Sequence, residues 1–293
     1  MSRGSCYLCG SLDLFKRAGR VRDSDTLEVL ECASCGLVSL SDFSHISLQH
    51  YQNSGMFGAE CPSIETRLRS GEHDDDRRSR SLAGLLTNKR ILDFGCGAGG
   101  FLLKASKVAE SVEGVEPEAR VRTRWAGKWV IHSSLEDLEG QSKRFDVITA
   151  FHVLEHLPDP KATLMRLAAL LVRGGRLVIE VPSADDALLT LYKCEAFQSF
   201  TYWSQHLFLF SASTLRALAK QAGLRVLAIQ AIQRYSLANH LGWLINGRPG
   251  GHIQHCFLET EELNRAYASL LASLGKTDTL FAHLEPIGFE NAK

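Results

Sequence analysis

The sequence lacks a long apolar run, an excess of charge of either sign, and any internal repeat or low-complexity segment. No stretch reaches 18 apolar residues, so no membrane-spanning helix is predicted. Met1-Ser2-Arg3-Gly4-Ser5 leads directly into cysteines without an apolar signal-peptide core, which favours a cytoplasmic protein. Lys plus Arg equals Asp plus Glu at 33 each, so the broad basic surface that grips a phosphate backbone is missing and nucleic acid is a disfavoured partner.

The composition that remains is that of a globular, enzyme-sized protein. With 293 residues, 45% of them apolar, the chain can bury one large core and a small appendage. It contains eight cysteines. Disulfides are rare in a reducing compartment, so these cysteines indicate metal binding or thiol chemistry.

Four of the cysteines form two matched pairs near the N-terminus. Cys6-Tyr7-Leu8-Cys9-Gly10 and Cys32-Ala33-Ser34-Cys35-Gly36 both read C-x-x-C-G, and 22 residues lie between the pairs. That length allows a hairpin that brings Cys6, Cys9, Cys32 and Cys35 around one tetrahedral zinc ion. Four thiolates leave no open coordination position, so the zinc would be structural. A redox pair and a set of free thiols are the alternatives.

The stretch around the first glycine cluster is the most informative part of the sequence. An apolar run ending in Asp93-Phe94 is followed by Gly95-Cys96-Gly97-Ala98-Gly99-Gly100 and then by a helix-like segment, a pattern typical of the nucleoside-binding side of a doubly wound α/β sheet. The glycine spacing also fits a dinucleotide fingerprint, but a carboxylate at Asp93 would repel a pyrophosphate. S-adenosylmethionine, whose ammonium and sulfonium groups are positive, would tolerate Asp93. Glu116 closes the next apolar strand, where an acidic side chain can accept from both ribose hydroxyls.

These residues resemble the class I S-adenosylmethionine-dependent methyltransferases. The resemblance covers roughly residues 80–232 and rests on four motifs at natural spacing. The motifs are Asp93 to Gly100, Val115-Glu116-Pro117, Phe145 to Leu157, and Arg173 to Pro182. A Rossmann-like fold that holds another nucleotide is the alternative.

Apolar and helical segments alternate through this region, as a parallel sheet requires. The expected strands lie near 91–94, 111–116, 129–132, 146–151, 175–182, 224–232 and 278–284, with helices at 160–172 and 212–223. Arg173-Gly174-Gly175 is expected to cap the first of these helices. The predicted fold is α/β, a Rossmann-like doubly wound sheet with a small N-terminal zinc ribbon, and the resemblance implies an antiparallel last strand.

The sequence is expected to divide into three segments: a zinc ribbon at 1–41, a connector ending in an amphipathic helix at 42–80, and a methyltransferase domain at 81–293. In the connector, the cluster Glu72 to Arg80 has acids before bases along a helix, which is typical of a solvated face, and it receives no catalytic role. Tyr51 and Phe57 either fold over the cofactor, as the corresponding aromatic stretch does in similar proteins, or fill the space between ribbon and core.

Ligands of doubly wound sheets bind outside the carboxyl ends of the strands. Together with the resemblance, this rule predicts a set of cofactor-binding residues: Asp93, Gly95, Gly97, Gly99, Glu116, Ser134, Leu135 and Phe151. Cys96 is expected to pack beneath the cofactor. His156, just before a turn with proline, is expected to bond to backbone and fix the loop, and a catalytic role is the alternative.

Methyl transfer is an in-line displacement at a sulfonium carbon, so it depends mainly on alignment, and a hydroxyl acceptor benefits from a base. His206 lies in the aromatic segment 200–210 that follows the fifth strand and is the candidate base. Its alternative role is to tether that segment. His152 is the weaker candidate for the base.

The connection 233–277 between the last two strands is unusually long. If the last strand is antiparallel, as in similar methyltransferases, this connection emerges beside the cofactor, where insertions are usually functional. The candidate acceptor-binding residues are Tyr202, Arg234, Tyr235, Asn239, His240 and Trp243, which suit a polyhydroxylated ring or a phosphate. A homodimer interface would use the same residue types. A covering helix is predicted at 261–274 with Leu263, Ala266, Tyr267 and Leu270 facing inward.

A ribbon joined to this core also resembles the zinc-ribbon methyltransferases of sugar and polysaccharide biosynthesis. Sugar C-methyltransferases of that kind carry a further large C-terminal domain, for which this sequence has no room. We therefore expect O-methylation of a sugar, sugar nucleotide or glycoconjugate hydroxyl. The alternatives are an RNA base methyltransferase whose ribbon grips RNA, which the neutral charge disfavours, and a cofactor-binding regulator without turnover.

Overall fold

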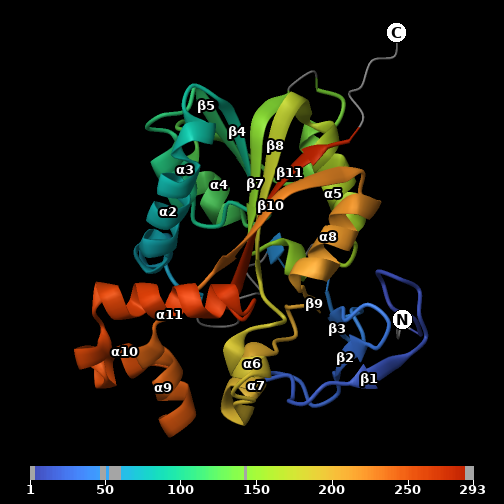
Figure 1. Cartoon of the computed structure of the whole chain (residues 1–293). Helices are drawn as coiled ribbons and strands as arrows, with labels where there is room; N and C mark the ends of the chain where they lie inside the picture. Colours follow the sequence, from blue (N-terminus) through green and yellow to red (C-terminus); the bar gives the residue numbers. More distant parts are fainter. Residues whose placement is uncertain (1–3, 47–50, 53–60, 142–143, 288–293) are drawn as a thin grey trace.

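A seven-stranded sheet forms the centre of the protein in a computed structural model that describes residues 4–46, 51–52, 61–141 and 144–287. The strand order across the sheet is β10-β11-β8-β7-β4-β5-β6 (Figure 1). The strands are β4 (Arg90–Phe94), β5 (Ser111–Val115), β6 (Val130–His132), β7 (Phe145–Phe151), β8 (Leu171–Pro182), β10 (Leu224–Ile232) and β11 (Thr279–Pro286). The inner strands β4, β7, β8 and β11 are mostly apolar and buried because helices cover both faces, whereas the edge strands β6 and β10 are mostly half-buried or exposed.

The strand directions confirm the predicted topology. β4 pairs parallel with β5 and β7, and β7 pairs parallel with β8. β11 is antiparallel to both of its neighbours, β8 and β10. The connection from β10 to β11 therefore leaves the sheet at the carboxyl edge of the parallel strands, as expected.

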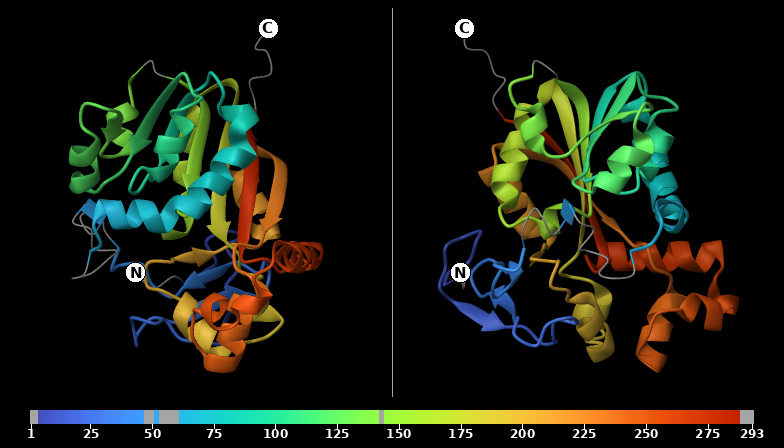
Figure 2. Two further views of the ribbon diagram at one scale, coloured as in Figure 1. Left: turned by 90° about the vertical axis from the view of Figure 1, so that its left-hand side faces the viewer. Right: turned by 180° about the vertical axis from the view of Figure 1, so that it is seen from behind.

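Helices pack on the two faces of the sheet, α2, α3 and α4 on one side and α5 and α8 on the other (Figure 2). Their bounds are α2 (Ile64–Leu86), α3 (Gly100–Ala105), α4 (Ala119–Trp125), α5 (Pro160–Ala169) and α8 (Ala212–Gln221). Short 3-10 turns η2 (Leu135–Leu138) and η3 (Leu154–His156) follow β6 and β7. Across the described residues, none of the helices combines the length and apolarity needed to cross a membrane.

The expected cap at the end of α5 is wrong. The helix ends at Ala169, and Gly174 lies inside β8 with a φ of 76°. Phe145 pairs with Leu171, but Val147 pairs with Arg176, so part of β8 bulges out opposite β7. Glycine occupies the left-handed position of that bulge because a Cβ is disfavoured there.

Helix α2 crosses the predicted boundary at residue 80. Ser63 caps its first turn by accepting a hydrogen bond from the Thr66 amide at 3.1 Å. Near the other end, Leu82 and Leu86 are buried against the central sheet. The helix is thus continuous from the connector into the core, and no boundary separates the two at this point.

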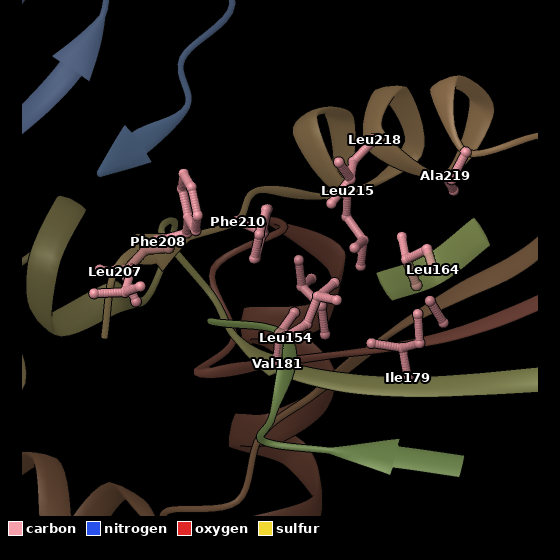
Figure 3. Packing of buried hydrophobic residues seen from close by; sticks show 14 of the residues in the cluster. Leu154, Leu164, Ile179, Val181, Leu207, Phe208, Phe210, Leu215, Leu218 and Ala219 are labelled. Carbon is pink, nitrogen blue, oxygen red and sulfur yellow. The ribbon is translucent and has the colours of Figure 1, made fainter. Parts of the chain in front are cut away.

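The N-terminal ribbon forms a second sheet that the core completes. β1 (Leu14–Lys16), β2 (Val29–Cys32) and β3 (Val38–Leu40) pair antiparallel, and β9 (Phe208–Leu209) adds a fourth strand beside β3. Phe208 and Phe210 lie in one cluster with Leu154, Val181 and Leu215 of the core (Figure 3). Val38 belongs to the same cluster. The segment around β9 therefore joins ribbon and core in one hydrophobic unit.

The insertion after β10 lies at the carboxyl edge of the sheet, near α6 (Ala187–Thr190) and α7 (Glu195–Thr201) (Figure 1). It contains α9 (Leu237–Asn246), α10 (Gly251–Gln254), η4 (Cys256–Leu258) and α11 (Glu261–Ser273). Tyr267 of α11 is buried as predicted, but Ala266 and Leu270 are exposed and Leu271 is buried instead. Leu263 is only half-buried. The helix touches the protein along a narrow stripe, so a small rotation decides which leucine is covered.

Candidate active site

A cavity of about 440 Å³ opens at the carboxyl ends of β4, β5 and β7. Six of the eight predicted cofactor-binding residues line it: Gly95, Gly97, Glu116, Ser134, Leu135 and Phe151. Tyr51 also lines it, while Phe57 lies outside the described residues. The cavity has the place and the glycine turn expected of a nucleoside site.

Glu116 connects the two sequence motifs of this cavity. One carboxylate oxygen accepts a hydrogen bond from the Gly97 amide at 2.9 Å, and the other accepts from the Glu118 amide at 3.0 Å. Burial raises the pKa of Glu116, although the two backbone amides oppose the shift. The side chain is thereby fixed at the wall of the cavity, against the glycine turn.

Asp93 and Gly99 are the two predicted cofactor residues that do not line the cavity. Asp93 is buried behind it and accepts a hydrogen bond from the Thr149 hydroxyl at 2.7 Å. Burial raises the pKa of Asp93 to about 7, even though this hydrogen bond opposes the shift. Gly99 has a φ of 86°, and a Cβ there would lie 2.6 Å from the Trp125 ring nitrogen. Both residues support the turn from behind.

Cys96 lies in the same turn and is buried among apolar side chains. A Cβ on Gly114 of β5 would come within 2.7 Å of its sulfur, so Cys96 fills the space that the missing side chain leaves. Burial raises the pKa of the thiol well above its ordinary value. Cys96 is therefore a packing residue without reactive character.

The charged cluster at 72–80 is not simply a solvated helix face, which corrects the sequence-based expectation. Arg77 and Arg78 of α2 both donate to the carboxylate of Glu180, at distances of 2.9 to 3.1 Å. Glu180 is fully buried in β8. Burial alone would raise its pKa, but hydrogen bonds from His152 and Arg78 hold it well below the ordinary value. A carboxylate inside a sheet needs such cations, and α2 supplies them.

His152 belongs to the same network. Its Nδ1 lies 3.2 Å from a carboxylate oxygen of Glu155, and its Nε2 lies 3.0 Å from Glu180 and 3.1 Å from Arg234. Burial lowers the pKa of His152, but the two carboxylates outweigh it and raise the pKa above the ordinary value. Both ring nitrogens are engaged, so this geometry argues against a role as base. The backbone φ of 55° turns the ring into the network.

A second cavity, of about 240 Å³, adjoins the first on the insertion side, and His152 lines both. The predicted acceptor residues Arg234, Tyr235, Asn239, His240 and Trp243 line it together with His206. Tyr202 does not. It is 3% exposed and packs against the ribbon, where a Cβ on Gly19 would meet its ring at 2.6 Å.

One wall of the second cavity is aromatic. The ring centroid of Trp243 lies 5.2 Å from that of Phe197 and 4.9 Å from that of Phe200. All three residues line the cavity, so α7 and the insertion build this wall together. Such a surface can stack against a flat or ring-shaped ligand.

Two buried carboxyl groups also line the second cavity. Asp186 caps α6 by accepting from the Leu188 amide at 2.7 Å, and burial raises its pKa to about 7. Asp278 accepts from the backbone amides of Arg234 and Tyr235 through one oxygen. Its other oxygen, Oδ1, is buried and has no hydrogen-bond partner among the described residues. These groups supply polar contacts that the sequence did not reveal.

The hydrogen-bonding side chains of the insertion are not equally available to a ligand. Arg234 is held by Asp74 of α2. The His240 ring is bonded to the hydroxyl of Tyr267 at 2.8 Å, and burial lowers the pKa of His240 to about 4. Among the described residues, none bonds to the Asn239 side-chain amide, which leaves it for a ligand.

His206 lies in a segment that the ribbon holds in place. In that segment, the amide and hydroxyl of Ser204 donate to Asp23 at 2.9 and 2.7 Å. Burial, together with the neighbouring His156, lowers the pKa of His206 to about 3. His156 bonds through Nδ1 to the backbone carbonyl of Gln205 at 2.7 Å, the backbone bond expected for it. Thus η3 and the segment before β9 are tied together.

The four ribbon cysteines converge. Cys6 and Cys35 have their sulfurs 3.6 Å apart, Cys9 and Cys32 have theirs 3.5 Å apart, and all four lie within 4.8 Å of one another. Gly10 and Gly36 have φ values of 75° and 77°, as the tight turn after each pair requires. The donor set and its spacing fit a tetrahedral metal ion.

Comparison with known proteins agrees with this architecture. The family model described as "Methyltransferase domain" matches residues 68–229, more than half of the chain. The protein belongs to the methyltransferase-domain family. The class I fold and the assignment as an S-adenosylmethionine-dependent methyltransferase are thereby confirmed at the level of the family.

Curated relatives of this methyltransferase are named "Ubiquinone biosynthesis O-methyltransferase". One from Xanthomonas euvesicatoria is 33% identical over 115 residues, which cover 36% of this chain and 48% of that protein. One from Coxiella burnetii is 29% identical over 166 residues, which cover 53% of this chain and 71% of that protein. The chain thus spans about half the length of the first relative.

Among solved structures, a chain from the complex between the Haloferax volcanii Trm112 methyltransferase activator and a methyltransferase has a similar fold. The TM-score is 0.52 at 15% identity, over 80% of this chain and 97% of that one. At this identity the likeness concerns the fold alone.

The charged network around the two cavities was not predicted from the sequence. Glu180, Asp186 and Asp278 are buried, and Asp74, Arg77 and Arg78 are half-buried. One signal was present. Glu180 interrupts the apolar run Leu177-Val178-Ile179-Glu180-Val181, and a buried glutamate needs cationic partners. The Arg77-Arg78 pair supplies those cations, but nothing in the sequence places α2 over β8.

Proposed function

We propose that this protein transfers the methyl group of S-adenosylmethionine to a hydroxyl of a sugar, sugar nucleotide or glycoconjugate. The observation that carries the proposal is the pair of adjoining cavities that share His152, one with the glycine turn and Glu116, the other with an aromatic wall and buried carboxyl groups. The hydroxyl oxygen would attack the methyl carbon as the carbon–sulfur bond breaks. The bond's electron pair goes to sulfur, and S-adenosylhomocysteine leaves.

The cofactor side of the proposal rests on Glu116. Its carboxylate is fixed at the wall by two backbone amides and can accept from ribose hydroxyls. Ser134 and Leu135, which follow β6, would border the adenine. Asp93 would act from behind the turn without direct contact, and a cationic ligand would favour its charged form over the neutral form that burial favours.

The acceptor side fits a ring with several hydroxyl groups. A sugar face can stack on Trp243, while its hydroxyls can donate to Asp278 and bond to the Asn239 amide. The unpartnered Asp278 oxygen makes this match specific, because a buried carboxylate oxygen costs stability until something donates to it.

His206 is the proposed proton acceptor, and its low pKa makes it a weak one. Alignment of the hydroxyl with the methyl group would then supply most of the rate enhancement. The second candidate acceptor is a phenolic hydroxyl, which the names of the O-methyltransferase relatives favour and which ionises more easily.

We also propose one structural zinc ion held by Cys6, Cys9, Cys32 and Cys35. Four convergent thiols and two left-handed glycine turns support it. The ion would hold together the short strands of the ribbon, whose β3 carries β9 and the segment before it. A homodimer stays a prediction.

The test supplies purified protein with labelled cofactor and a panel of sugar nucleotides, glycans, phenols and RNA. We expect labelled methyl on a sugar hydroxyl, with formation of S-adenosylhomocysteine. Asp278→Asn should raise KM for the sugar acceptor and leave cofactor affinity unchanged, whereas the exposed control Glu261→Gln should change neither. Methylation of a phenol or RNA alone would overturn the sugar assignment, and binding without turnover would identify a regulator.

A further inference from the structure

A second group of metal-ligating side chains lies between the two cavities, far from the ribbon cysteines in sequence. Glu155, His156 and His206 each offer one ligand atom, and these atoms lie within 4.8 Å of one another. His156 lines the first cavity and His206 lines the second. The group comes from two elements, η3 and the segment before β9, that the Gln205 carbonyl joins.

Two polar atoms of this group are buried and have no hydrogen-bond partner among the described residues. Glu155 is fully buried, and its Oε2 has no hydrogen-bond partner among the described residues. The Nδ1 of His206 is buried and lacks a described partner as well. His156 donates from Nδ1 to the Gln205 carbonyl, which leaves the lone pair of its Nε2 for another partner. An unpaired buried polar atom costs about 1–3 kcal/mol, so a shared positive partner, which the Nε2 of His156 can also bind, would explain both the Glu155 oxygen and the His206 nitrogen.

The surrounding contacts are those that orient metal ligands. A ligating histidine usually donates its other ring N–H to a carbonyl or carboxylate, as His156 does to Gln205. A ligating carboxylate is usually hydrogen-bonded on its other oxygen, as Glu155 is by His152 at 3.2 Å. Two imidazoles and one carboxylate are a donor set for divalent transition metals, and three protein ligands leave a coordination position open.

We propose that Glu155, His156 and His206 bind a divalent transition-metal ion such as Zn²⁺ at the junction of the two cavities. The open position would take the acceptor's hydroxyl oxygen, a step that rests on the proposed function. Metal binding lowers the pKa of a bound hydroxyl, so its proton passes to solvent before the oxygen attacks the methyl carbon. His206 is then a ligand, and the ion takes the role proposed above for a base.

Metal content tests this inference without any methyl transfer. The intact chain is stripped with a chelator, titrated with Zn²⁺ or Co²⁺, and analysed for bound ions and for its visible spectrum. We expect two ions per chain in the wild type and one in His206→Ala, with the cobalt–thiolate bands of the ribbon retained. Cys32→Ser should keep one ion and lose those bands. The exposed control His73→Ala should still bind two.

One ion per chain in the wild type, lost in Cys32→Ser and unchanged in His206→Ala, would overturn the inference. If His206→Ala does not fold, cobalt titration of the wild type decides, because a second ion without thiolate bands is expected and its absence overturns the site. Methyl transfer by protein holding only the ribbon ion leaves the proposed function intact and overturns this inference. Binding of a second ion without any methyl transfer would support this inference and overturn the proposed function.

Discussion

Replacing Glu180 with glutamine should lower the free energy of unfolding by about 3 kcal/mol. Glu180 is fully buried, and both of its oxygens accept from Arg77 and Arg78. Removing one partner of a buried ion pair typically costs about 3–5 kcal/mol, because the remaining charge stays buried. The lower end applies here, since Arg77 keeps Asp74 and Arg78 keeps Asp75 as partners.

Urea denaturation at neutral pH measures this difference. The control is Glu261→Gln, which removes an exposed ion pair with Arg265 one helical turn away and should cost at most about 0.5 kcal/mol. Equal effects of the two substitutions would refute the interpretation of Glu180 as the anchor of a buried network. A cooperative transition in both variants, with the same slope against urea, is required for the comparison.

The pH dependence gives the same prediction an independent check. The pKa of Glu180 is depressed in the folded protein, so its contribution to stability is fully present above the ordinary glutamate pKa of about 4.3. That contribution is lost as the pH falls below this value toward the folded pKa. The difference in stability between wild type and Glu180→Gln should therefore be constant from neutral pH down to about 5 and shrink below it. A constant difference down to about pH 3 would contradict the assignment.

Further outcomes are expected at four other positions. Glu116→Ala should weaken S-adenosylmethionine binding by about 10-fold to 100-fold with the fold intact, and an unchanged calorimetric affinity would remove Glu116 from the site. The pKa of Asp93 is raised to about 7 in the folded protein, so its contribution to stability is fully present below the ordinary aspartate pKa and is lost as the pH rises through 7. The free energy of unfolding of Asp93→Asn minus that of wild type should therefore be larger at pH 8 than at pH 5. An equal difference at the two pH values would speak against this assignment. His206→Ala should lower turnover with little change in cofactor affinity, and full activity would exclude it both as base and as ligand. Cys32→Ser should lose the ribbon zinc and lower the thermal midpoint, which metal analysis and circular dichroism would show.

Local sequence signals were enough to predict which residues line the first cavity, the candidate cofactor site. The glycine turn and Glu116 are close in the chain and joined by one pair of parallel strands, β4 and β5, so their meeting follows from strand order alone. The same is true of Ser134 and Leu135, which follow the next strand. Asp93 shows the limit of this reasoning, because its position along β4 was correct while its side chain is bonded to Thr149 behind the cavity.

The lining of the second cavity, the candidate acceptor site, depended on packing that the sequence does not encode locally. Tyr202 and Trp243 both looked like acceptor contacts, yet the ribbon covers the first and the insertion presents the second to the cavity. Asp186 and Asp278 looked like ordinary helix and strand boundary residues, and only the folded chain buries both beside one cavity. Leu271 likewise could not be distinguished from its neighbours until α11 had a surface to lie on.

The amino-acid sequence by itself determined the alternation of strands and helices, the glycine turn and Glu116 at the edge of the sheet, and the convergence of four cysteines. Each of these follows from short-range periodicity, glycine spacing or paired motifs, which act over a few residues. Only the tertiary structure decided that α2 neutralises Glu180, that β9 completes the ribbon sheet, and that Glu155, His156 and His206 meet. Those contacts join segments far apart in the chain, and burial and charge pairing select them only once the whole core has closed.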